Sequence, residues 1–144
     1  MNRCAVHVGR LVEIRATSGY RSRKEVDAIM ENIGQEIAKI PATQRVVTVT
    51  DWRRCPILSA EASEHLLRAI TSYNPRTERS AAIASRASPT SVMQFVRLVR
   101  DSKHPDRRLF FSVEKLTEWL DEILSPAESA RLRAFLAERD SEPA

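Results

Sequence analysis

Hydrophobic residues alternate with polar ones at the start of the chain, which is the pattern of strands with one buried face. Two such segments, residues 6–8 and residues 12–16, flank Gly9 and Arg10. A short connection that contains glycine, placed between two alternating segments, favours a tight reversal of the chain. We therefore expect an antiparallel hairpin at the amino-terminal end.

Further along, hydrophobic residues recur at intervals of three and four, which is the spacing of one face of a helix. The first of these stripes follows Ser22 and Glu25, which have the spacing of a capping box, and it ends at Pro41. Serines at N-cap positions precede three later stripes: Ser59, Ser88 and Ser125, the last with Glu128 in a second capping box. The stripes predict five helices, with their apolar residues within 26–40, 62–73, 92–99, 116–124 and 132–136.

Three short apolar segments, residues 46–50, 81–84 and 109–111, separate the helical stripes. Short apolar runs without alternation are typical of strands that are covered on both sides. Strands that alternate with helices form a mostly parallel sheet with right-handed crossovers, and the hairpin adds an antiparallel edge. We predict an α/β fold with a mixed, mostly parallel sheet of four or five strands and four or five helices. Whether the helices cover both faces of the sheet or mainly one is left open by the sequence.

The chain has 144 residues, of which 42% are hydrophobic and 29% are charged, as expected for one folded domain. We place this domain at residues 1–139, with a helical extension at residues 125–139 and a loose tail at residues 140–144. No run of about 18 apolar residues occurs, and the apolar segment near the start is too short for a signal peptide. We therefore expect a soluble cytoplasmic protein without a membrane span.

Glycine, histidine and cysteine are scarce, with 3, 3 and 2 copies. No pair of glycines has the spacing of a phosphate-binding loop, and two cysteines cannot form a four-cysteine zinc site. Cys55 precedes a predicted helix, but no histidine has a spacing that brings a base to its thiol. Cys4 and His7 lie on a predicted strand and point to opposite faces. We expect no enzyme activity, no cofactor and no metal.

Two segments resemble the STAS domain, the fold of bacterial anti-sigma-factor antagonists, and its SpoIIAA-like relatives. One is the strand at residues 45–51 that leads to Ser59. The other is the strand, turn and helix at residues 108–120, where a strand containing phenylalanine precedes a Trp-Leu pair. The resemblance covers about residues 4–124, and it implies a STAS-like sheet and the docking of a protein partner rather than catalysis.

The chain departs from the family at the position of the phosphorylation switch. Members that act as switches carry an Asp-Ser pair at the start of the helix after the central strand, and an Asp closes that strand about eight residues earlier. Counting from Asp51 leads to Ser59 and Ala60, so the position of the phosphate acceptor holds an alanine. Ser59 lies one residue early, where it caps the helix. This departure argues against kinase-driven switching and leaves the docking surface in place.

Partners and ligands of open α/β sheets bind at the carboxyl ends of the strands, where three predicted loops meet. The first loop supplies the candidate partner-binding residues, which are Asp51, Trp52, Arg53, Arg54 and Ser59. Tryptophan and arginine dominate binding hot spots. The alternative is that the Trp52 ring covers the end of the sheet while the arginines are solvated.

The second loop supplies candidate anion-binding residues, Arg86, Ser88 and Thr90. A helix that starts at Ser88 offers free N–H groups and the positive end of its dipole to a phosphate or carboxylate. The alternative is that Ser88 only caps its helix.

The formal net charge of +4 hides an uneven distribution. Residues 1–112 carry 19 Lys and Arg against 11 Asp and Glu, whereas residues 113–144 carry 4 against 8. A basic body and an acidic end favour electrostatic docking, within the molecule or between copies. The basic cluster at residues 97–108 is interrupted by aspartates and lacks an aromatic stacking platform, so we expect no nucleic-acid binding.

Two functions follow as hypotheses. The first is a non-enzymatic module that docks a protein partner in a bacterial regulatory pathway. The second, as the resemblance to SpoIIAA-like proteins permits, is a protein that binds a small anionic or lipid-like ligand between sheet and helices. The helix faces with Phe95 and Trp119 suit either a pocket or an ordinary core. A homodimer through the last predicted helix is a further hypothesis.

Overall fold

The computed structural model describes residues 1–138. The tail predicted for residues 140–144 and the last residue of the predicted helical extension lie outside the described residues. The order of strands and helices is as predicted, with one added 3-10 turn at Asn74–Arg76. The strands are β1 (Asn2–Ala5), β2 (Leu11–Ala16), β3 (Val46–Asp51), β4 (Thr77–Ile83) and β5 (Arg107–Phe110). The helices are α1 (Arg23–Ile37), α2 (Ala60–Ser72), α3 (Pro89–Asp101), α4 (Val113–Asp121) and α5 (Pro126–Ala137).

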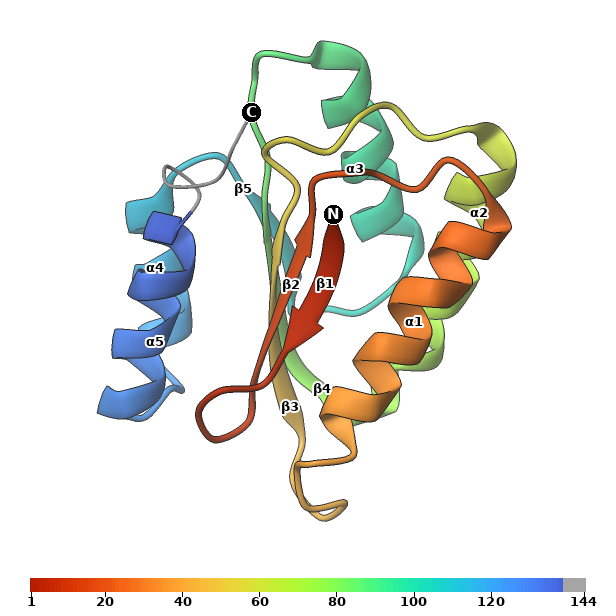
Figure 1. The fold of residues 1–144 in the computed structure, drawn as a ribbon. Helices are drawn as coiled ribbons and strands as arrows, with labels where there is room; N and C mark the ends of the chain where they lie inside the picture. Colours follow the sequence, from red (N-terminus) through yellow and green to blue (C-terminus); the bar gives the residue numbers. More distant parts are fainter. Residues whose placement is uncertain (139–144) are drawn as a thin grey trace.

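The five strands form one sheet in the order β1-β2-β3-β4-β5 (Figure 1). β1 pairs with β2 antiparallel, and every other neighbouring pair is parallel. This arrangement confirms the predicted mixed, mostly parallel sheet with an N-terminal hairpin. Because neighbouring strands in the sequence are neighbours in the sheet, the helices α1, α2 and α3 are the crossovers between parallel strands.

The first strand of the hairpin lies earlier than predicted. Cys4 pairs with Ile14, and the ladder ends at Ala5, so residues 6–8 belong to the connection rather than to a strand. The N–H of Val6 donates to the Glu36 carboxylate on α1 instead of joining a strand ladder. Alternation over three residues was too short a signal to separate a strand from its loop.

Helices cover both faces of the sheet, which the sequence had left open. Figure 1 shows α1, α2 and α3 on one side and α4 with α5 on the other. β3 separates two cores, because Val47 and Val49 face α4 and α5 while Val46 and Trp52 pack on the side of α1 to α3. Each face of the sheet therefore has its own hydrophobic core.

The two predicted capping boxes differ in the structure. At Ser125 the box is complete, since the serine hydroxyl accepts from the Glu128 N–H and the Glu128 carboxylate accepts from the Ser125 N–H. At Ser22 only half of it forms, because the Glu25 carboxylate accepts from the N–H of Arg21 instead. The prediction of a reciprocal box at Ser22 was therefore wrong, although Ser22 does cap α1.

The outer edge of β1 is covered by α1. Asn32 accepts a hydrogen bond from the Cys4 N–H at 2.8 Å, and Glu36 accepts one from the Val6 N–H at 2.9 Å. Side chains of the helix thus satisfy backbone donors that an edge strand ordinarily presents to solvent. Within the described part of the chain, no helix is long and apolar enough to cross a membrane.

Candidate ligand-binding cavity

Trp52 is buried at the carboxyl end of β3, with 6% of its surface exposed. Its ring stacks on Phe95, with centroids 4.5 Å apart, and its indole N–H donates to the Tyr20 hydroxyl at 3.0 Å. This placement matches the second interpretation of the sequence, in which the ring covers the end of the sheet. A partner that docks here does not meet an exposed indole.

The neighbouring charged residues are engaged inside the chain. Asp51 and Arg15, with side chains 3% and 2% exposed, form an ion pair at 2.8 Å, and Arg53 binds the same carboxylate at 3.0 Å. The two arginines also donate to the last turn of α5, Arg15 to the Phe135 carbonyl and Arg53 to the Leu136 carbonyl. We call Arg15, Asp51 and Arg53 the α5 clasp, since together they hold α5 on the sheet. Partner binding by Asp51 and Arg53 stays a prediction, whereas their contacts with α5 depend on a helix that is distant in the sequence.

The remaining predicted partner residues lie beside the clasp. Arg54 is half-buried, and Ser59 is exposed at the start of α2. The Ser59 hydroxyl accepts from the N–H of Ala62 at 3.1 Å, which confirms its prediction as a helix cap. Ala60 is the first residue of α2 and presents only a methyl group.

The three candidate anion-binding residues do not converge. The Arg86 guanidinium lies over the Phe111 ring, 4.0 Å from its centroid, and shares a shallow depression with Arg53. Neither Ser88 nor Thr90 lines this depression. Ser88 occupies the N-cap position of α3, but its hydroxyl bonds to the Ser91 hydroxyl and accepts no backbone N–H.

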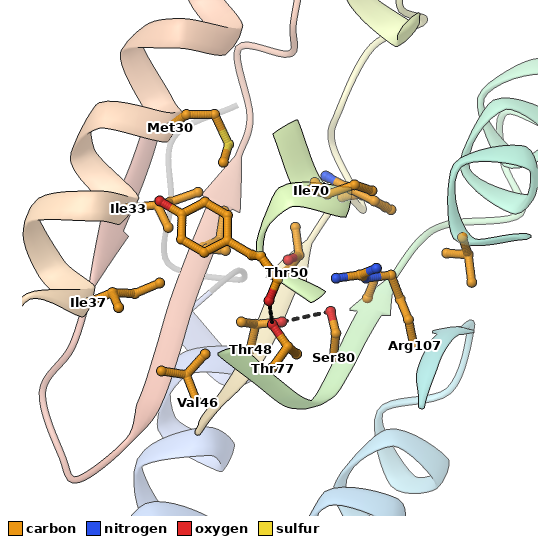
Figure 2. A pocket seen from close by; sticks show the side chains of 15 residues that line it. Met30, Ile33, Ile37, Val46, Thr48, Thr50, Ile70, Thr77, Ser80 and Arg107 are labelled. Atoms are coloured by element: carbon orange, nitrogen blue, oxygen red, sulfur yellow. Dashed lines mark hydrogen bonds between the residues drawn. The ribbon is translucent and has the colours of Figure 1, made fainter. Parts of the chain in front are cut away.

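A second hollow lies between the sheet and helices α1 to α3 (Figure 2). The space between its lining atoms is about 580 Å³ when the solvent at its open side is included, whereas the cavity proper has a volume of only about 60 Å³. The lining residues are Ile14, Met30, Ile33, Ile37, Val46, Thr48, Thr50, Trp52, Ile70, Tyr73, Thr77, Ser80, Ala82, Val99 and Arg107. Phe95 and Trp119, which the sequence offered for a pocket, are not among them. They belong to the two cores on opposite faces of the sheet.

The cavity has an apolar wall and a hydroxyl-bearing floor. The helices contribute mainly hydrocarbon, as Figure 2 shows for Ile33 and Ile37. The sheet contributes four hydroxyl groups, from Thr48, Thr50, Thr77 and Ser80. Two of them bond each other, Thr48 to Ser80 at 2.7 Å, and Thr77 donates to the Tyr73 carbonyl at 2.8 Å.

Arg107 brings a positive charge to this cavity from β5. Its guanidinium donates to the Asn74 side-chain carbonyl at 2.7 Å. Among residues 1–138, no carboxylate lies within salt-bridge distance of Arg107. Burial lowers the pKa of Arg107 to about 10, because it removes part of the charged guanidinium from water. A half-buried cation with one neutral partner is suited to an anion.

The sequence analysis placed Arg107 only in the basic cluster at residues 97–108 and missed its position in the cavity. One available signal was the alternation along β5, which places Arg107 on the same side as Leu109 and Phe111. Another was the alternation of valine and threonine in β3, because threonines at every second position give one face of the strand a polar character. Both signals require knowing which side each helix covers.

The two thiols show no sign of activation. Cys4 and Cys55 are both buried and free, and burial raises the pKa of each to about 12. No group of three or more His, Cys, Asp or Glu side chains within residues 1–138 is arranged to hold a metal ion.

No family model matches the chain, and no curated protein matches it. A search of solved structures finds an uncharacterized protein of the DUF3478 family with a SpoIIAA-like fold, from Shewanella loihica PV-4. The two structures superimpose with a TM-score of 0.59 at 16% sequence identity, over 83% of this chain and 95% of the other. At this identity the likeness concerns the fold alone, and it agrees with the predicted order of strands and helices. The chain therefore has a SpoIIAA-like fold of the STAS type.

Proposed function

We propose that the protein binds a small amphipathic molecule with a negatively charged head group in the cavity between the sheet and helices α1 to α3. The observation that carries this proposal is the half-buried guanidinium of Arg107 at the edge of an otherwise largely apolar cavity, without a carboxylate partner. An uncompensated charge in such a place costs folding free energy, and a bound anion would offset that cost.

The strand register supports a position for the charged head group beside Arg107, Ser80 and Thr48. Arg107 pairs with Ser80 across β4 and β5, and Ser80 pairs with Thr48 across β3 and β4, so the three side chains form one row across the sheet. The hydroxyls of Thr48 and Ser80 use one of their two protons to bond each other, and the second proton is left to donate. A carboxylate beside Arg107 would accept from both the guanidinium and this hydroxyl pair.

The apolar part of the ligand would lie along the helices. Met30, Ile33, Ile37 and Ile70 line the wall, so a hydrocarbon body here leaves water and gains about 25 cal/mol for each Å² buried. The cavity thus favours a ligand with one charged end and a hydrocarbon body over a compact polar anion.

A titration with decanoate, decanol and decylammonium tests the proposal. We expect decanoate to bind about 10- to 100-fold more tightly than decanol, as for a hydrogen bond to a charged group, and decylammonium not to bind. The indole N–H of Trp52, which lines the cavity, should shift in the ¹H–¹⁵N spectrum, whereas that of Trp119 should not.

Two variants of neighbouring arginines provide a matched pair for this titration. Arg107→Gln should abolish the preference for decanoate over decanol. Arg108→Gln should retain it, because Arg108 lies on the other face of β5, over the Trp119 ring. Equal preference in the wild type and in Arg107→Gln would contradict the proposal.

A second candidate, docking of a regulatory protein partner, is favoured by exposed apolar side chains near the predicted docking loop. Ile57 is 54% exposed in the segment before α2, and Met93 on α3 is 58% exposed. The Gln94 side chain bonds both the N–H and the carbonyl of Leu58, so it fixes this segment against α3. Exposed hydrophobic groups on a rigid support are typical of protein-binding surfaces.

Affinity purification from the host tests this second candidate. The double variant Ile57→Asp with Met93→Asp should lose a protein that the wild type recovers. The charge-matched variant Ser63→Asp with Thr71→Asp, on α2, should retain it. Recovery of the same proteins by all three baits would exclude docking through Ile57 and Met93.

A further inference from the structure

One hydroxyl group on the floor of the cavity has no partner. The Thr50 side chain lines the cavity and is 8% exposed, and its hydroxyl makes no hydrogen bond with any group of residues 1–138. The other three hydroxyls of the floor are bonded, two to each other and that of Thr77 to a carbonyl. The Thr50 oxygen is not fully buried, so water can satisfy it, and a ligand that displaces this water must offer a partner in its place.

Thr50 lies away from the position proposed for the head group. Its row across the sheet contains Ala82 and Leu109, one row beyond Arg107, Ser80 and Thr48. Adjacent rows on one face are two residues apart, which is about 7 Å along the strand. Thr50 is also on β3, two strands from Arg107. A carboxylate bound to Arg107 therefore does not reach Thr50, and the partner must belong to another part of the ligand.

The residues around Thr50 are apolar, so the part of the ligand that bonds Thr50 must be a single polar group within a hydrocarbon segment. Ile14 and Ala82 pair with Thr50 on the two adjacent strands, and Trp52, two residues further along the chain, also lines the cavity. A plain alkyl chain that passes over Thr50 would seal its hydroxyl away from water without replacing the hydrogen bond. A ligand with an oxygen at this point would complete the hydrogen bond, because a hydroxyl both donates and accepts.

From this geometry we infer that the ligand is a carboxylate with a hydroxyl or keto oxygen in the middle of its hydrocarbon body, recognised by Thr50. This inference rests on the proposed function of the same cavity, and it narrows the class of ligand from alkyl carboxylates to hydroxy- or oxo-carboxylates. Arg107 binds the carboxylate, and Thr50 forms a hydrogen bond with the second oxygen.

The test compares decanoate with a series of hydroxydecanoates that differ in the position of a mid-chain hydroxyl. Each is titrated against the wild type, Thr50→Val and Thr43→Val by isothermal titration calorimetry. Valine has the shape of threonine and suits a strand, so Thr50→Val removes the hydroxyl with little change in packing. Thr43 is exposed in the turn before β3 and serves as the matched control.

We expect Thr50→Val to weaken binding of at least one hydroxydecanoate about three- to tenfold, as for the loss of one neutral hydrogen bond. Binding of decanoate should be unchanged or stronger in the same variant, and Thr43→Val should alter neither. A melting curve of each variant confirms that the fold is retained.

Two outcomes overturn the inference, and they are distinguishable. If decanoate binds with dependence on Arg107 while Thr50→Val changes all ligands equally or none, the proposed function stands and Thr50 does not read an oxygen of the ligand. A bound water as the partner of Thr50 gives this result. If no anion of the series binds with dependence on Arg107, the proposed function fails together with the inference.

Discussion

Threonine at every second position of β3 gives the two faces of the sheet different chemistry. Val47 and Val49 fill a close-packed core under α4 and α5, whereas Thr48 and Thr50 face the cavity. Threonine retains the branched shape that strands favour while adding a hydroxyl. A strand of this composition keeps its backbone geometry and still provides polar groups on one side only.

The buried thiols allow a prediction at single residues. Because burial raises the pKa of Cys4 and Cys55 to about 12, from an ordinary 9.0, less than about 1 in 1,000 of either is thiolate at pH 8. Native protein treated with iodoacetamide at pH 8 should show no adduct by mass spectrometry. Protein in concentrated urea should show two. An adduct formed within minutes on the native protein would contradict this expectation.

The burial and contacts of single residues were harder to predict from the sequence than the order of strands and helices. The N-cap role of Ser59 was predictable, because capping depends on a few adjacent residues. The burial of Trp52 and the position of Arg107 in the cavity were not, since each depends on helices that are distant in the sequence. The unpartnered hydroxyl of Thr50 is visible only when all its neighbours are in place.

Helix caps, at the scale of elements, differ in how much they stabilise. Ser125→Ala removes a bond to the Glu128 N–H, so it should lower the free energy of unfolding by about 1 kcal/mol. Ser88→Ala should cost less than half as much, because the Ser88 hydroxyl caps no backbone N–H of α3. Urea denaturation of both variants measures the difference. Equal losses would mean that the two serines act alike.

The complete capping box at α5 also connects distant elements. Besides closing the box, the Glu128 carboxylate accepts from the N–H of Arg10 at 2.8 Å, in the connection between β1 and β2. Gly9 in that connection has a φ of 57°, and the Glu128 side chain occupies the space that a Cβ there would need. The sequence predicted the box and the glycine turn separately, but not their contact, because more than a hundred residues lie between them.

At the scale of the whole molecule, the α5 clasp connects β2 and the end of β3 to α5. Asp51 is the carboxylate between two arginines, and its loss would leave Arg15 buried with weaker compensation. Asp51→Ala should lower the free energy of unfolding by about 3 kcal/mol, the lower end of the range for a broken buried pair, because Glu138 also approaches Arg15.

Thermal and urea unfolding of matched variants measure this effect. Asp101→Ala, at an exposed pair with Arg100, should leave the free energy of unfolding almost unchanged. Adding Arg15→Met to Asp51→Ala should recover part of the loss, since it removes the buried charge whose compensation was weakened. A loss below about 1 kcal/mol in Asp51→Ala alone would show that the clasp contributes little to stability.

The covered edge of β1 limits how this sheet can grow. Because α1 side chains occupy the outward N–H groups of Cys4 and Val6, a strand from another chain cannot extend the sheet there without displacing the helix. The opposite edge is β5, a strand of only four residues that begins with two arginines. Two copies that joined through β5 would each end at a β1 covered by α1. Association by strand addition would therefore stop at a pair and could not propagate into a fibre.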